Sequence, residues 1–187
     1  MQPTLEKMID AFNTNEKQKV INYIADYKQK SEELSYEEYM KWVIVFCPPH
    51  KWYIKAFNHE SKMLKVYQVI VEGKEKLKSC KSFDEIITYI DGIKLAGFSE
   101  LAKYDTAIAT GIRFQLMPDK VFLHAGPRYA LKYILKDQFE MHIKKLNNSK
   151  HMEYIEFSNL PYEFQQFKDN KYLVEDCLCY IYSKFLK

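Results

Sequence analysis

Residues that turn or break a chain are scarce in this sequence. It has five glycines and six prolines among 187 residues, which is below average usage. Sandwiches and barrels need many tight turns, whereas helices joined by short connections need few. Because 47% of the residues are hydrophobic, one sizeable core can be filled. The sequence therefore predicts an all-α or mainly α fold, a helical bundle that forms a single domain over residues 1–187.

The spacing of apolar residues and the helix-capping signals place the expected helices. Ser35 with Glu38, and Ser82 with Glu85, have the serine-to-glutamate spacing of a capping box. The helix that Ser35 opens is expected to stop at Pro48. Residues 73–81 are expected to form a solvated connection, and VYQVIV within 59–72 also fits a strand. Helices are expected over residues 3–12, 15–30, 35–47, 59–72, 83–92, 104–115, 127–136 and 171–187.

The net charge and the cysteine content exclude few classes of function. A net charge of +3 is too small to identify a nucleic-acid binder. The four cysteines lack the paired spacing of a zinc site, and the histidines add none, so free thiols in a reducing compartment are expected. Cys177 and Cys179 should point to different sides of the last helix. With no signal peptide and no apolar run long enough for a bilayer, we expect a cytoplasmic protein with no metal, no cofactor and no membrane partner.

The segment 104–133, YDTAIATGIRFQLMPDKVFLHAGPRYALKY, holds the two arginines among 28 basic residues. Proline suits the first position of a helix, so a helix is expected to begin at Pro127. Its start, with His124 before it and Arg128 in its first turn, is predicted to bind phosphate. Alternatively, Arg128 pairs with an internal carboxylate such as Glu175 or Asp176. The remaining residues expected at this site are Gly126, Lys103, Lys120 and Lys132 for phosphate, with Arg113 and Tyr104 in support.

The order of motifs in the hairpin-like core segment 97–136 resembles the helix-hairpin-helix DNA glycosylase superfamily, over about residues 101–134. Thr106-Ala107 opens an apolar helix, Pro118-Asp119 forms a turn, and His124 precedes the next helix. The resemblance implies a helical fold and contact with DNA. It places the family's glycine hairpin at residues 101–103, which hold no glycine.

The same resemblance aligns the family's catalytic aspartate with His124 and its Schiff-base lysine with Asp105. Both expected catalytic groups are therefore absent. In the resembled fold these two positions face one cleft, so Asp105 and His124 could pair as an acid or base. The alternative is that each satisfies buried backbone groups.

Three functions are compatible with these features. The first is a non-catalytic or altered-chemistry binder of nucleic acid or nucleotide, with DNA, RNA or a phosphorylated small molecule as partner. The second is a protein-interaction or structural module that kept the scaffold and lost the chemistry. The third is an enzyme that uses Asp105 and His124. Aromatic and lysine side chains interleave in residues 50–57 and 171–185, as in single-strand binders, although such stripes more often form core.

Overall fold

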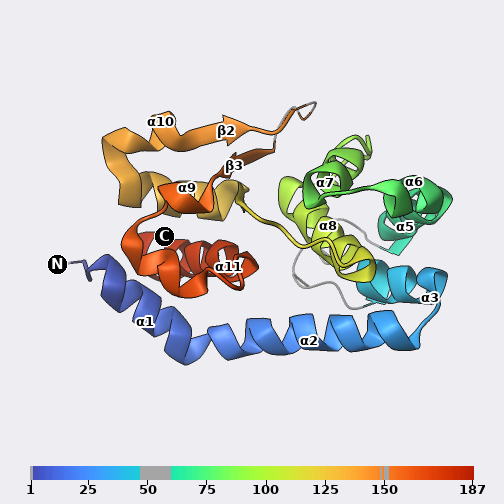
Figure 1. The fold of residues 1–187 in the computed structure, drawn as a ribbon, viewed down its shortest axis with the longest axis horizontal. Coiled ribbons are helices and arrows are strands. Elements are labelled where there is room, and N and C mark those ends of the chain that lie inside the picture. The colour runs from blue at the N-terminus through green and yellow to red at the C-terminus, as the bar shows by residue number, and fades with distance from the viewer. Residues whose placement is uncertain (1, 47–59, 148, 150–151) are drawn as a thin grey trace. The chain divides into compact units, whose positions relative to one another are not determined.

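The computed structural model describes residues 2–46, 60–147, 149 and 152–187 (Figure 1). The chain forms two compact units. The first unit comprises residues 1–22, 118–146 and 150–187, and the second comprises residues 23–117 and 147–149. Most described residues are helical, so the expected mainly α class is confirmed. The single domain expected from the sequence stays a prediction.

The first unit combines helices from both ends of the chain with a small sheet (Figure 1). Phe12 is fully buried, and its ring makes edge contacts with Phe167 and Tyr180 at centroid distances of 6.0 and 5.9 Å. The aromatic residues of the C-terminal third therefore hold the N-terminal helix in this unit. The elements are α1 (Leu5–Asn15), β1 (Val121–Leu123), α9 (Ala125–Leu135), α10 (Phe139–His142), β2 (Ile143–Lys145), β3 (Glu153–Ile155) and α11 (Tyr172–Ile181), with a 3₁₀ helix at Tyr162–Phe167 and a π-helical turn at Tyr182–Leu186.

The sequence predicts no strand between the helices expected over 104–115 and 127–136, but β1 lies there and forms a small sheet with β2 and β3. The sheet is antiparallel, with strand order β1-β3-β2. Val121 lies opposite Ile155, and Leu123 opposite Glu153. All three residues of β1 are buried. A strand buried on both faces shows no alternation of apolar and polar residues, and one of three residues is too short to give a periodic signal.

In the second unit, every regular element among the described residues is a helix. Helix α2 (Lys17–Glu33) runs from the first unit into the second. The other elements are α3 (Tyr36–Lys41), a π-helical turn at Trp42–Phe46, α5 (Glu60–Glu72), α6 (Lys74–Ser79), α7 (Phe83–Asp91) and α8 (Glu100–Phe114). The helix expected over 59–72 is thus confirmed, and its strand alternative is wrong. The solvated connection expected over 73–81 is also wrong, because the fully buried Leu77 anchors α6 there.

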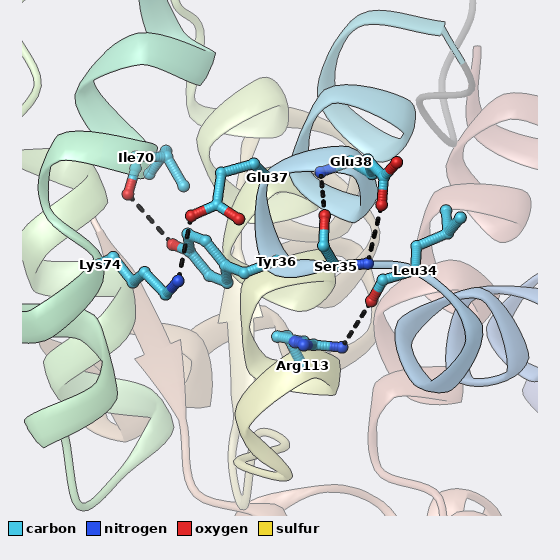
Figure 2. A network of polar contacts seen from close by, with 8 residues as sticks. All are labelled: Leu34, Ser35, Tyr36, Glu37, Glu38, Ile70, Lys74 and Arg113. Carbon is cyan, nitrogen blue, oxygen red and sulfur yellow. Dashed lines mark hydrogen bonds and ion pairs between the residues drawn. The ribbon is translucent and has the colours of Figure 1, made fainter.

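Both predicted helix starts carry a serine cap. At α3 the backbone N–H of Glu38 donates to the Ser35 hydroxyl, and the Ser35 N–H donates to the Glu38 carboxylate (Figure 2). At α7 the Glu85 N–H donates to the Ser82 hydroxyl, but the Glu85 carboxylate accepts from Lys81 N–H instead. The expected stop at Pro48 and the aromatic stretch 50–57 lie outside the described residues.

Helix α8 begins four residues earlier than expected, because Ser99 caps it and accepts from the Ala102 N–H. Residues 101–103, aligned above with a glycine hairpin, therefore form its first turn. The helix ends at Phe114, where Gln115 takes the left-handed conformation at φ 58° and Leu116 N–H donates to Gly111 O. A Cβ at Gly111 would lie 2.3 Å from Leu116 O. The chain can therefore turn back at the end of α8 only if residue 111 is a glycine.

Among the described helices, none is long and apolar enough to cross a lipid bilayer.

Candidate functional site

His124 directly follows strand β1 and directly precedes helix α9. His124 has extended backbone angles, and its carbonyl oxygen accepts from the Arg128 N–H at 3.0 Å, which is the first hydrogen bond of the helix. The helix therefore begins at Ala125, two residues before the expected Pro127. Proline is tolerated there because an N–H in the first turn has no partner within the helix.

The imidazole of His124 belongs to a buried three-residue cluster. Its Nε2 is hydrogen-bonded to Glu175 Oε1 and lies 3.7 Å from Cys179 Sγ. The Cys179 Sγ is 3.4 Å from the same carboxylate oxygen. His124 is 7% exposed and Glu175 2% exposed, while Cys179 is half-buried. A nitrogen, an oxygen and a sulfur thus converge on one small volume, and these three residues have the ligand atoms needed to hold a metal ion.

Helix α11 presents Glu175 and Cys179 on one face, because residues four apart in a helix lie one turn above each other. Cys177 points to the core and is fully buried, so the two cysteines face different sides as expected. Burial raises the pKa of the Cys177 thiol, and this keeps it in the unreactive protonated form. The carboxylate-to-thiol spacing on one helix face was the sequence signal for this cluster. The spacing of the cysteines alone does not indicate it.

Gly126 allows α9 to approach α11 at this point. A Cβ added to Gly126 would lie 3.2 Å from Cys179 Sγ and 3.6 Å from Cδ1 of Tyr182. A side chain here would push directly on the cluster. Gly126 is therefore half-buried against α11, whereas it was singled out in the sequence for amides facing a phosphate.

Arg128 has an internal partner, as the alternative drawn from the sequence allowed. The partner is Glu153 on β3 and not Glu175 or Asp176, the two carboxylates suggested. Glu153 is mostly buried, with 12% of its side chain exposed, while 45% of the Arg128 side chain is exposed. Tyr154 is the next residue of β3. The centroid of its ring lies 4.4 Å from Lys120 Nζ, which is a cation–π contact.

The outer face of α9 alternates basic and aromatic side chains. Arg128 and Tyr129 are exposed in its first turns, and Lys132 and Tyr133 follow one turn later. Tyr129 is 59% exposed and Tyr133 44% exposed. Tyr129 also stacks on Tyr182, with ring centroids 5.5 Å apart and planes within 19°. This face, defined by Arg128, Tyr129, Lys132 and Tyr133, is called the basic aromatic face below.

The remaining predicted site residues lie in the second unit. Lys103 forms a largely buried ion pair with Asp91 at 2.7 Å, and Arg113 donates to carbonyl oxygens at the end of α2. Tyr104 is buried in an edge contact with Phe83. Asp105 is 5% exposed within α8. Its pairing with His124, which lies in the first unit, stays a prediction.

Comparisons with protein-family models, with curated proteins and with solved structures gave no match to this chain, so its function is inferred from its own residues.

Proposed function

We propose that this protein binds single-stranded nucleic acid through the basic aromatic face of α9. The observation that carries the proposal is the exposure of two tyrosines at the same helical spacing as two cations, within one stretch, RYALKY. Exposed aromatic rings stack on bases, and lysine or arginine beside them contacts the phosphates between those bases. The apolar residues Ala130 and Leu131 of the same stretch are fully buried, so in this stretch the two cations and the two tyrosines face solvent.

Two features support the aromatic part of the proposal. The two exposed rings lie one helical turn apart on the same face of α9, so both are available to stack on bases of one strand. The stack of Tyr129 on Tyr182 fixes the orientation of the first ring. A ring that is already ordered loses less conformational entropy when a base stacks on it.

The ion pair of Arg128 with Glu153 is compatible with a phosphate contact. The pair uses Nη1 of Arg128, and a guanidinium carries five N–H donors. Glu153 therefore holds the side chain in place, and the pair leaves other donors of this half-exposed guanidinium for a phosphate. Lys132, which is exposed one turn further along α9, supplies the second cation.

The test is fluorescence anisotropy of a short labelled poly(dT) or poly(U) strand, titrated with the protein at several salt concentrations. Affinity should fall with salt at a slope of about −0.7 for each phosphate contacted. Tyr129→Ala should weaken binding by about 1–3 kcal/mol, the value of one stacked base. Lys132→Ala should weaken binding and reduce the slope by about one phosphate contact.

Matched controls come from the 3₁₀ helix of the same unit. Tyr162 is 87% exposed, and Lys168 is exposed directly after that helix. Tyr162→Ala and Lys168→Ala remove the same chemical groups elsewhere on the surface, so they should leave affinity unchanged. No binding at low salt, or an equal loss in the control variants, would exclude the proposal.

A further inference from the structure

We propose that His124, Glu175 and Cys179 form a binding site for a zinc ion. This site is separate from the basic aromatic face, because its ligands come from the residue before α9 and from α11, and none of them belongs to that face. The proposal does not depend on nucleic-acid binding. It rests on the geometry, charge and chemical type of the three side chains.

The separations between the ligand atoms suit a tetrahedral ion. Zinc binds sulfur at about 2.3 Å and imidazole nitrogen or carboxylate oxygen at about 2.0 Å, which puts two ligand atoms of a tetrahedron about 3.5 Å apart. Cys179 Sγ lies 3.7 Å from His124 Nε2 and 3.4 Å from Glu175 Oε1. The third pair, Nε2 and Oε1, is hydrogen-bonded and would open by a small side-chain rotation as the ion enters.

The charges of the site balance when zinc is bound. Metal ligands bind in their deprotonated forms, so Cys179 would contribute a thiolate, Glu175 a carboxylate and His124 a neutral imidazole. Two negative ligands neutralise a divalent cation. A neutral complex is compatible with the burial of His124 and Glu175, at 7% and 2% exposure, whereas an uncompensated ion is not.

The ligand types select the metal. A thiolate and an imidazole favour zinc over magnesium or calcium, which prefer oxygen. Three protein ligands are one fewer than a closed structural site contains, so the fourth position would be open to water or to a bound molecule. Cys179 is half-buried, so this ligand is partly exposed to solvent.

The same three residues could instead suggest a cysteine nucleophile, but the geometry disagrees. In a nucleophile–histidine–carboxylate triad, the carboxylate and the nucleophile contact opposite nitrogens of the ring. Here Glu175 and Cys179 both face Nε2 of His124. Convergence on a single nitrogen is what shared coordination of one ion requires.

Secondary structure positions all three ligands. Glu175 and Cys179 lie one turn apart on α11, and His124 lies between β1 and α9. Gly126 permits the close approach of α9 to Cys179. Ligands fixed on helices and at strand ends need little reorganisation to bind.

The test is titration of the full chain, purified with a chelator and then dialysed, with Co²⁺ as a spectroscopic substitute for Zn²⁺. One equivalent should give visible bands of tetrahedral cobalt and a near-ultraviolet thiolate-to-cobalt band, and Zn²⁺ should displace both. Cys179→Ser, Glu175→Gln and His124→Gln should each weaken binding by about 100-fold or more. Even loss of an outer partner of a ligand costs about 10- to 100-fold.

Matched controls use residues outside the cluster. Cys80→Ser removes a half-buried thiol of the second unit, and His142→Gln removes an imidazole of α10. Neither should change the cobalt spectrum or the affinity. Absence of stoichiometric binding by the wild-type chain would overturn the proposal, as would equal binding by the ligand variants.

A second measurement needs no variant and covers the case in which a ligand variant does not fold. Iodoacetamide should alkylate Cys179 in the chelator-treated wild-type chain, and one equivalent of Zn²⁺ should slow that reaction at least about tenfold, because a coordinated sulfur is a poor nucleophile. Peptide mass spectrometry would follow Cys80 as the internal reference. Equal alkylation rates at Cys179 with and without Zn²⁺ would mean that the three residues form a hydrogen-bonded cluster and bind no zinc, which would overturn the proposal.

Discussion

The guanidinium of Arg113 donates to the carbonyl oxygens of Ser31 and Leu34, where helix α2 ends. Figure 2 shows the bond to Leu34. The last carbonyls of a helix have no partner within it, so a side-chain donor at this point satisfies groups that would otherwise be unpaired. Two carbonyls are reached from one planar group. An ammonium group offers no such fixed pair of donors.

Arg113→Lys should therefore cost about 1.5–3 kcal/mol of the free energy of unfolding, the usual value for hydrogen bonds to a charged group. Urea denaturation of the full chain measures this loss of stability. Arg128→Lys is the matched comparison. Arg128 forms a partly exposed ion pair with Glu153, so its replacement should cost less than about 1 kcal/mol. Equal losses in the two variants would contradict the distinction between these arginines.

The sequence placed two residues of the first unit correctly but not their partners. His124 and Arg128 were correctly placed at the start of a helix, because Pro127 marks that point. Their partners lie 51 and 25 residues away, on α11 and β3. Pairings over such distances depend on how α9, α11 and the sheet pack, and local sequence patterns carry no information about that packing.

At the scale of elements, the local hydrogen-bonding signals were the reliable ones. The serine caps at Ser35 and Ser82 are confirmed, since a serine hydroxyl accepts from the backbone N–H three residues on, within one turn. The reciprocal bond of a full capping box forms at Ser35 but not at Ser82. The sheet was missed because each strand has three residues, and its partners are set by long-range packing. Helix α6 was missed because its single buried anchor, Leu77, stands among lysines.

The capping box of α3 leads to a prediction about the pKa of Glu38. Hydrogen bonds from the Ser35 side chain and backbone lower the pKa of Glu38. A carboxyl whose pKa is lower in the folded chain stabilises it above the unfolded pKa, and this contribution is lost as the pH falls through the folded pKa. Ser35→Ala should raise the pKa of Glu38 toward its ordinary value, as followed by NMR titration of the side-chain carboxyl.

Glu37, the next residue of the same helix, is the internal control. Its pKa is lowered chiefly by the hydrogen bond from Lys74 (Figure 2). Ser35→Ala leaves that bond in place, so the pKa of Glu37 should stay unchanged. If the two glutamates shifted together, the shift would reflect loss of the whole helix α3 and not of its cap.

At the scale of the whole molecule, the two compact units draw their cores from different parts of the chain. The first unit needs both chain ends, since Phe12 of α1 packs on Phe167 and Tyr180. The second unit is assembled around α7 and α8 from the middle of the chain, and Ile87 of α7 is fully buried there. Stability can thus be lost in one unit before the other.

Phe12→Ala and Ile87→Ala form a matched pair that tests this separation. Each removes a fully buried side chain, at an expected cost of about 3–5 kcal/mol for phenylalanine and about 2–5 kcal/mol for isoleucine. Hydrogen exchange followed by mass spectrometry should show faster exchange in α9 and α11 for Phe12→Ala, and in α7 and α8 for Ile87→Ala. Phe12→Ala should also weaken cobalt binding, because Tyr180, which contacts Phe12, adjoins Cys179. Equal loss of protection in all four helices in both variants would instead mean that the chain unfolds as one cooperative body.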